Sequence, residues 1–294
     1  MAHSGGMAGY ASRRALARIV PLLRHPRYEV FPAAGVQDAV CAAVPTDVTV
    51  AVTASEIRGL DATLDLTARL AGRGYQVVPH LPARLVRDDA HLSAIVDRLL
   101  ASGVTDVFVP AGDARQPAGR FADAVSLLDR LAAMGRPFGQ VGVTGYPQRH
   151  PRIADEATIR AMWDKRHHAS YLVSNLCLDP VVLARWIGAV RARGVTLPLR
   201  VGVSGPVDRA RLLRLATVAG VPGAARFAAG HRDWLLRAAL PGGYRPTRLL
   251  QRTAGTLADP ASAVAGLHIF TFNQVERAER WRTALLRRLA AEDR

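Results

Sequence analysis

Cysteine and lysine are almost missing from this chain. Its 294 residues include only two cysteines, Cys41 and Cys177, and they are too far apart to form the close cysteine pairs of a zinc site. Two thiols in apolar surroundings are typical of a cytoplasmic protein without a disulfide framework, so we expect both to be buried. Lys165 is the single lysine, and arginine supplies every other basic side chain.

Aromatic residues and long apolar runs are scarce as well. Aromatic residues make up 6% of the chain, whereas surfaces that bind single-stranded nucleic acids interleave aromatic with basic residues. The formal net charge of +15 suits a polyanion, but the arginines are scattered, so we favour a solvated basic surface and no nucleic-acid partner. No apolar run approaches the roughly 18 residues that span a bilayer, so we expect no membrane partner.

The first residues contain a weak export-like pattern. Ser12-Arg13-Arg14 is followed by Ala15-Leu16-Ala17, but Arg18 and Pro21 interrupt the hydrophobic stretch that an export signal needs. We therefore expect residues 1–26 to form a leader and a short helix, and residues 27–294 to form one domain.

Strand-like and helix-like segments alternate along the rest of the chain. The predicted strands cover residues 28–32, 47–53, 75–80, 105–110, 139–144, 170–176, 197–203 and 267–272. The predicted helices cover residues 60–70, 88–100, 120–134, 155–166, 180–193, 207–218 and 274–290. This alternation, without a dinucleotide-binding glycine pattern after the first strand, predicts the α/β class and a single (β/α)8 barrel. The long connection 222–260 is a candidate lid.

Several apolar runs stop at a motif that contains polar residues or glycine, at or just beyond the predicted strand ends. These motifs include Glu29, His80, Gly112-Asp113 and Tyr146. The carboxyl ends of barrel strands line the active site, and a charge there is costly unless it faces a cavity. We therefore expect the functional residues at these strand ends.

In this order, the strand-end motifs resemble the 5,10-methylenetetrahydrofolate reductase family over about residues 28–273. The matching motifs are Tyr28-Glu29-Val30-Phe31-Pro32, Val52-Thr53, His80-Leu81, Gly112-Asp113, Tyr146 to Pro151, Lys165, and His268 to Asn273. The resemblance implies an oxidoreductase that reduces methylenetetrahydrofolate to 5-methyltetrahydrofolate with NADH or NADPH. A reduced folate would be the small-molecule partner of a cytoplasmic monomer or small homo-oligomer.

The resemblance also implies a role for each matching residue. Glu29 would be the general acid that opens the folate ring, with its pKa raised by burial, and Asp113 would stabilise the resulting cation. The expected substrate contacts are Asn175, Phe270 and Gln274, and the expected cofactor contacts are Thr53, His80, Gly112, Tyr146, His150 and Lys165. Glu29 as a surface carboxylate and Asp113 as a helix cap remain alternatives.

Some positions depart from the family pattern. Ala111 replaces an arginine, Pro82 a threonine and Phe270 a tyrosine, and losing a charged contact should weaken FAD binding. We therefore favour direct hydride transfer from NADH or NADPH over transfer through FAD. Other hypotheses are a barrel enzyme acting on another pterin or a phosphorylated small molecule, and a basic nucleic-acid-binding protein.

Overall fold

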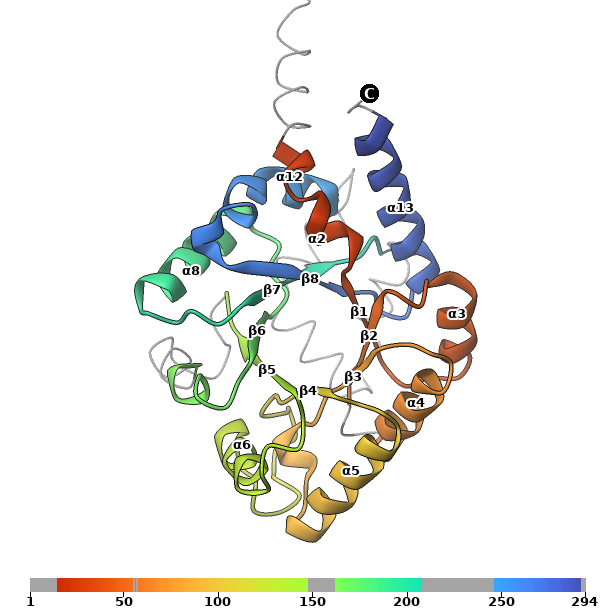
Figure 1. Ribbon diagram of the computed structural model, residues 1–294, viewed down its shortest axis with the longest axis vertical. Coiled ribbons are helices and arrows are strands. Elements are labelled where there is room, and N and C mark those ends of the chain that lie inside the picture. The colour runs from red at the N-terminus through yellow and green to blue at the C-terminus, as the bar shows by residue number, and fades with distance from the viewer. Residues whose placement is uncertain (1–14, 55, 57, 148–161, 208–245, 292–294) are drawn as a thin grey trace, which may run out of the picture.

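Eight parallel strands form the centre of the molecule (Figure 1). The computed structural model describes residues 15–54, 56, 58–147, 162–207 and 246–291. Its strands are β1 (Arg27–Val30), β2 (Thr49–Val52), β3 (Val77–Pro79), β4 (Asp106–Phe108), β5 (Gln140–Gly145), β6 (Tyr171–Ser174), β7 (Leu199–Ser204) and β8 (Val264–Phe270). They are hydrogen-bonded in the order β3-β2-β1-β8-β7-β6-β5-β4, and a parallel bridge between His80 and Phe108 joins the two ends. This confirms the predicted α/β class and the single-domain (β/α)8 barrel.

Helices surround the strands on the outside of the ring (Figure 1). They are α2 (Val20–Arg24), α3 (Val36–Ala43), α4 (Asp61–Ala71), α5 (Asp89–Ala101), α6 (Ala124–Ala133), α8 (Pro180–Ala192), α12 (Pro246–Leu257) and α13 (Val275–Ala291), with short 3-10 turns η1 (Ala83–Leu85) and η2 (Pro260–Ser262). Their apolar faces and the outward side chains of the strands form one continuous core. No helix among the described residues is both long enough and apolar enough to cross a bilayer.

Aspartate caps explain where several helices begin. Asp88 accepts a hydrogen bond from the His91 N–H at the start of α5, and Asp179 accepts bonds from the first turn of α8. Asp123 caps α6, so this helix begins four residues later than the predicted range 120–134. The other predicted helices in the described regions agree with the structure to within about one residue.

The structure confirms some of the remaining predictions on short helices, the candidate lid and the cysteines, and contradicts others. The short helix before β1 is confirmed as α2, whereas α3, a helix of eight residues, was not expected. Within the candidate lid, residues 246–257 form α12, which contacts α8 in the outer layer, and residues 222–245 lie outside the described residues. All but the first residue of the predicted helix 207–218, and most of 155–166, also lie outside them. Cys177 is buried as expected, but Cys41 is exposed.

Strand register determines which side chains point into the barrel. In a parallel sheet, paired residues share a face, and Glu29 pairs with Ala51 and Phe270, while Arg27 pairs with His268. Glycine makes room for large inward side chains, since a Cβ on Gly142 would lie 2.3 Å from the Tyr171 ring. The barrel therefore contains polar layers as well as a small apolar cluster.

The first polar layer lies at the amino-terminal end of the strands. Arg27 donates hydrogen bonds of 2.5 Å to Asp106 and to the Tyr171 hydroxyl, and that hydroxyl donates to Asp106 at 2.7 Å. Arg200 lies nearby, with its guanidinium carbon 5.8 Å from the centre of the Tyr171 ring. Burial and the neighbouring Arg27 lower the pKa of Arg200 to about 10. These contacts hold the side chains of the amino-terminal layer of the barrel in place.

Candidate active site

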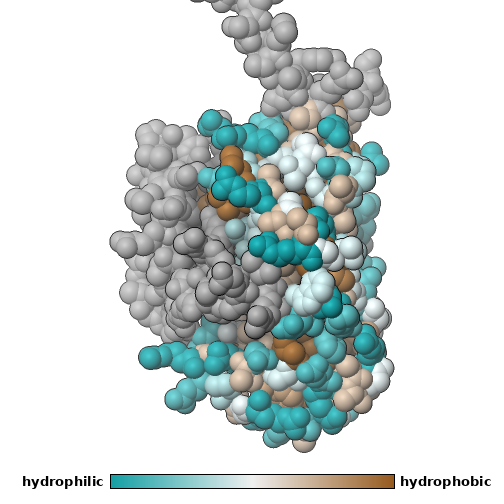
Figure 2. All heavy atoms as spheres, turned by 90° about the vertical axis from the view of Figure 1, so that its left-hand side faces the viewer, coloured by the Kyte–Doolittle hydropathy of each residue, from teal (hydrophilic) through white to brown (hydrophobic). Residues whose placement is uncertain are grey.

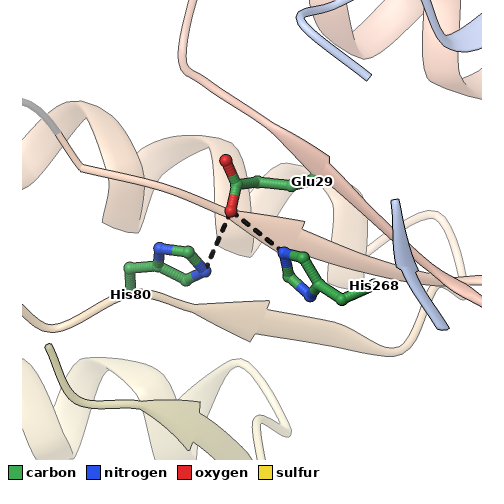
Figure 3. A group of neighbouring side chains, drawn as sticks. All are labelled: Glu29, His80 and His268. Atoms are coloured by element: carbon green, nitrogen blue, oxygen red, sulfur yellow. Dashed lines mark hydrogen bonds and ion pairs between the residues drawn. The ribbon is translucent and has the colours of Figure 1, made fainter. Parts of the chain in front are cut away.

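Three ionisable side chains meet inside the barrel, one layer nearer the carboxyl ends of the strands. Glu29 comes from β1, His80 directly follows β3, and His268 lies in β8. Strands far apart in the sequence supply the three residues, and only closure of the barrel brings them together. Figure 3 shows the Glu29 carboxylate directed toward both imidazole rings.

The Glu29 carboxylate is the centre of this group. Its Oε2 atom lies 3.0 Å from Nε2 of His268, at hydrogen-bond distance, and 3.9 Å from Nε2 of His80. The two imidazole rings stand 6.3 Å apart and are stacked at 28°. Phe108 lies against His80 at 4.6 Å and Phe270 against His268 at 5.0 Å, measured between ring centres. The aromatic neighbours restrict the orientation of both imidazoles and exclude water from one side of each ring.

Burial and the histidines act in opposite directions on Glu29. Burial alone would raise the pKa of this carboxyl group, but the hydrogen bond from His268 and the electrostatic interactions with both imidazoles together outweigh it, so the pKa is lowered. The sequence analysis predicted the opposite, a Glu29 pKa raised by burial. Glu29 is therefore a carboxylate at neutral pH, suited to accept a proton or bind a cation rather than to donate a proton.

His80 is neutral at physiological pH. Burial lowers its pKa to about 4, and the charges of His268 and Arg27 act in the same direction, with partial compensation from Glu29. An imidazole that gains a proton only near pH 4 is a weak base. It is nevertheless ready to bind a metal ion, because protons do not compete for its ring nitrogen at pH 7.

The unsatisfied ring nitrogens test whether a metal ion fits. Among the described residues, Nε2 of His80 is buried without a hydrogen-bond partner, although it faces the Glu29 carboxylate. One donor atom from each of Glu29, His80 and His268 lies within 4.8 Å of the others. Donor atoms around a tetrahedral ion with bonds of about 2.1 Å are roughly 3.4 Å apart. The Glu29 and His268 atoms are already 3.0 Å apart, so an approach of His80 from 3.9 Å and loss of the proton between Glu29 and His268 would complete a site of two histidines and one carboxylate. The three residues therefore fit a divalent ion.

The structure places only two of the predicted site residues in this group, Glu29 and His80. Phe270 lies at the edge of this group, where its ring packs against the imidazole of His268. Asn175 lies just after β6, where its side chain accepts a hydrogen bond from the Leu176 N–H, and Gln274 starts the turn into α13. Asp113 is exposed, near enough to Tyr146 for its charge to help burial raise the pKa of that phenol.

The remaining residues were predicted to contact the cofactor, and none of those that the structure describes belongs to the group of Glu29, His80 and His268. Thr53 continues the β1–β2 pairing through its N–H, and Gly112 has a φ of 92° in a turn where a Cβ would lie 2.9 Å from Pro82. Lys165 is buried, and burial lowers its pKa against the opposing charges of Asp123 and Asp164. His150 lies outside the described residues.

His268 is the site residue that the sequence prediction missed. It was noted only as the first residue of the closing motif and received no role. The available signal was a histidine inside an apolar strand, because a buried imidazole requires a polar partner. That partner, Glu29, lies 239 residues away in the sequence.

Comparisons with known proteins support the fold but no family, since no family model matches the chain. A structure from Burkholderia cenocepacia J2315, provisionally assigned as a lyase/mutase, is 17% identical over 96% of this chain and 88% of its own, with a TM-score of 0.50. The C-terminal domain of a provisionally assigned chitinase from Desulfitobacterium hafniense DCB-2 is 11% identical over 90% of this chain and 99% of its own, with a TM-score of 0.50. A phosphonomutase-like protein from the same Burkholderia strain is 12% identical over 94% of this chain and 99% of its own, with a TM-score of 0.49. At these identities the similarity shows the barrel fold alone.

These comparisons contradict the predicted membership of the methylenetetrahydrofolate reductase family. With it, the predicted folate reduction, the NADH or NADPH donor and the FAD cofactor are wrong, because they depended on the resemblance. The matching motifs are only a few residues long, and polar strand ends recur in unrelated barrels for structural reasons. The lowered pKa of Glu29 also fails to provide the proton donor that this reaction requires.

Proposed function

We propose that this chain is a metal-dependent barrel enzyme in which Glu29, His80 and His268 bind one divalent ion. The observation that carries the proposal is the convergence of these three donor atoms, all within 4.8 Å, inside the barrel. Two imidazoles and one carboxylate form the ligand set of many catalytic zinc sites, which keep a further position open for substrate.

The surroundings suit chemistry on a small anionic molecule. A bound divalent ion would polarise a carbonyl or carboxylate oxygen of such a substrate. Without the ion, the ionised Glu29 accepts a hydrogen bond from Nε2 of His268, and a bound ion would displace that proton. Phe108 and Phe270 limit water beside the histidines. The net charge of +15 favours encounter with anions. As the reaction class we propose a lyase or mutase reaction, which is the class named for the Burkholderia structure of the same fold.

The first test is metal binding. Protein treated with a chelator is titrated with Co²⁺ while its visible absorption is recorded, and Zn²⁺ is then added as a competitor. We expect one ion per chain. Glu29→Gln and His80→Gln should each weaken binding by at least about 100-fold, since each removes a direct ligand. His25→Gln is the matched control, because the His25 side chain is 68% exposed on the outside of the molecule.

The second test is turnover. The metal-loaded protein is incubated separately with 2-oxo acids, dicarboxylates and phosphonates, and proton and phosphorus NMR spectra are followed for new products. We expect conversion of at least one of these compounds, lost both in Glu29→Gln and after chelation. Absence of Co²⁺ binding, or binding equal in Glu29→Gln and the unaltered protein, would refute the metal centre.

A further inference from the structure

The turn that follows β8 makes an unusual set of contacts with the end of β1. Regular pairing of these strands ends at Glu29 and Phe270. Beyond that point, two side chains of the turn add hydrogen bonds to the backbone of β1 and of the residues that follow it. The contacts come from Thr271 and Asn273, neither of which has a role in the proposed metal binding.

Thr271 holds the backbone of Glu29 itself. Its hydroxyl donates a hydrogen bond of 2.6 Å to the Glu29 carbonyl oxygen, which also accepts the Thr271 N–H at 3.3 Å. The same hydroxyl accepts the Asn273 N–H at 3.2 Å, so the two residues of the turn are linked. Thr271 is only 1% exposed, and in this environment each hydrogen bond lost would leave a buried polar group unsatisfied.

Asn273 holds the residue two positions after Glu29. Its side-chain oxygen accepts the Phe31 N–H at 2.9 Å, and its side-chain nitrogen donates to the Phe31 carbonyl at 2.9 Å. The amide thus pairs with Phe31 as a neighbouring strand would. On the opposite edge of β1, the Thr53 N–H donates to the Val30 carbonyl, so the strand end is held from both sides.

The turn has a backbone conformation that is costly for its residues. Phe272 and Asn273 have φ values of 52° and 60°, in the left-handed region that few residues other than glycine adopt. Such conformations are energetically unfavourable and persist where the surrounding contacts enforce them, often at functional sites. At Asn273 these contacts include the two hydrogen bonds of its side chain to Phe31 in the extension of β1.

We infer that Thr271 and Asn273 are positioning residues that set the Glu29 carboxylate against His268 and His80. This inference rests on the proposed function of the three residues as one centre. A shift of the β1 backbone would move the carboxylate relative to both imidazoles, since His268 lies in β8 and His80 follows β3. The turn after β8 therefore sets the geometry of the centre through the backbone of β1.

The test compares variants that remove one contact each. Asn273→Gly removes the amide but tolerates a positive φ, and Thr271→Val removes the hydroxyl at nearly constant volume, whereas Thr271→Ser retains it. We expect Co²⁺ affinity to fall by about 10–100-fold in Asn273→Gly and Thr271→Val, with a changed visible spectrum, and to recover in Thr271→Ser. In the metal-free protein, the ring ¹⁵N resonances of His268 should move in the same two variants.

Thr253→Val is the matched control. The Thr253 hydroxyl is also buried and donates to the Leu249 carbonyl at 2.9 Å, but it lies in α12 in the outer layer. It should lower stability without changing the spectrum or the His268 resonances. Unchanged Co²⁺ affinity and His268 resonances in Asn273→Gly and Thr271→Val, or equal changes in Thr253→Val, would overturn the inference. If the unaltered protein binds no Co²⁺, the metal proposal fails, and the resonances alone decide whether the turn positions Glu29.

Discussion

At the scale of single residues, the partners of Glu29 decide its chemistry. A carboxyl group at the end of an apolar strand can be a proton donor if burial dominates, and this was the expectation from the sequence. His268 reverses the outcome, because its hydrogen bond favours the ionised form. The presence of a carboxyl group in the barrel was therefore predictable from position, but its protonation state was not.

His80 leads to a prediction about pH. Its pKa is about 4 in the folded protein and about 6.5 in an unfolded chain. As pH falls from 6.5 toward 4, the unfolded chain takes up a proton that the folded protein does not, so folding stability decreases. For metal-free protein we expect a loss on the order of 2 kcal/mol between pH 7 and pH 5 from this group. Urea unfolding at both pH values measures it.

His80→Gln provides the control for this pH effect. The variant lacks the titrating group, so its stability should change less between the two pH values than that of the unaltered protein. An equal pH dependence in both proteins would show that His80 does not titrate between them.

At the scale of secondary-structure elements, the positions of the strands followed from apolar runs and those of the helices from amphipathic spacing. All eight strands lie where the sequence predicts them, because a buried parallel strand requires a continuous apolar segment. The short helix α3 was missed, since eight residues give too little periodicity to recognise. Which strand residues point inward, and therefore which glycines are needed, depended on the register between strands.

The inward glycines of the barrel give a second prediction. A Cβ at Gly142 of β5 would lie 2.3 Å from the Tyr171 ring, so Gly142→Ala should destabilise the protein by at least about 1–3 kcal/mol through overpacking. Gly188→Ala in α8 is the matched control, because nothing lies within 4 Å of its added Cβ. There we expect a gain of about 1 kcal/mol from helix propensity. Urea unfolding compares them, and equal effects would contradict the packing described for the barrel interior.

At the scale of the whole molecule, charged residues bind the two ends of the described chain together. Glu279 and Arg282 of α13 are buried and pair with each other at 2.7 Å. Arg282 also donates to the carbonyl groups of Leu23 and Arg24 at the end of α2, and Glu279 accepts the Tyr28 hydroxyl of β1 at 2.7 Å. Elements from opposite ends of the sequence therefore share one polar cluster.

This cluster predicts a large difference between two arginines of the same helix. Arg282→Met leaves Glu279 buried without its charged partner and should cost about 3–5 kcal/mol of unfolding free energy. Arg280→Met breaks only the exposed pair with Glu276 and should change stability by about 0.5 kcal/mol or less. Urea unfolding of both variants would measure these changes. A comparably small loss of unfolding free energy in both variants would show that the buried cluster contributes little.

The outer surface of the described residues carries scattered exposed apolar side chains. On the face shown in Figure 2, hydrophilic residues are interspersed with small apolar spots. Among the described residues, the large exposed apolar side chains are Leu100, Trp163 and Val181. Isolated exposed apolar residues are common on soluble proteins and do not identify a partner.

The sequence by itself determined the alternation of strands and helices, and hence the barrel, because burial of apolar segments is a local requirement that each segment records. It also placed Glu29 and His80 at strand ends. Only the tertiary structure decided that His268 joins them, that Glu29 remains ionised, and that Thr271 and Asn273 hold its strand. These features depend on contacts between residues more than 200 positions apart, and such contacts follow from strand register and barrel closure rather than from any local pattern.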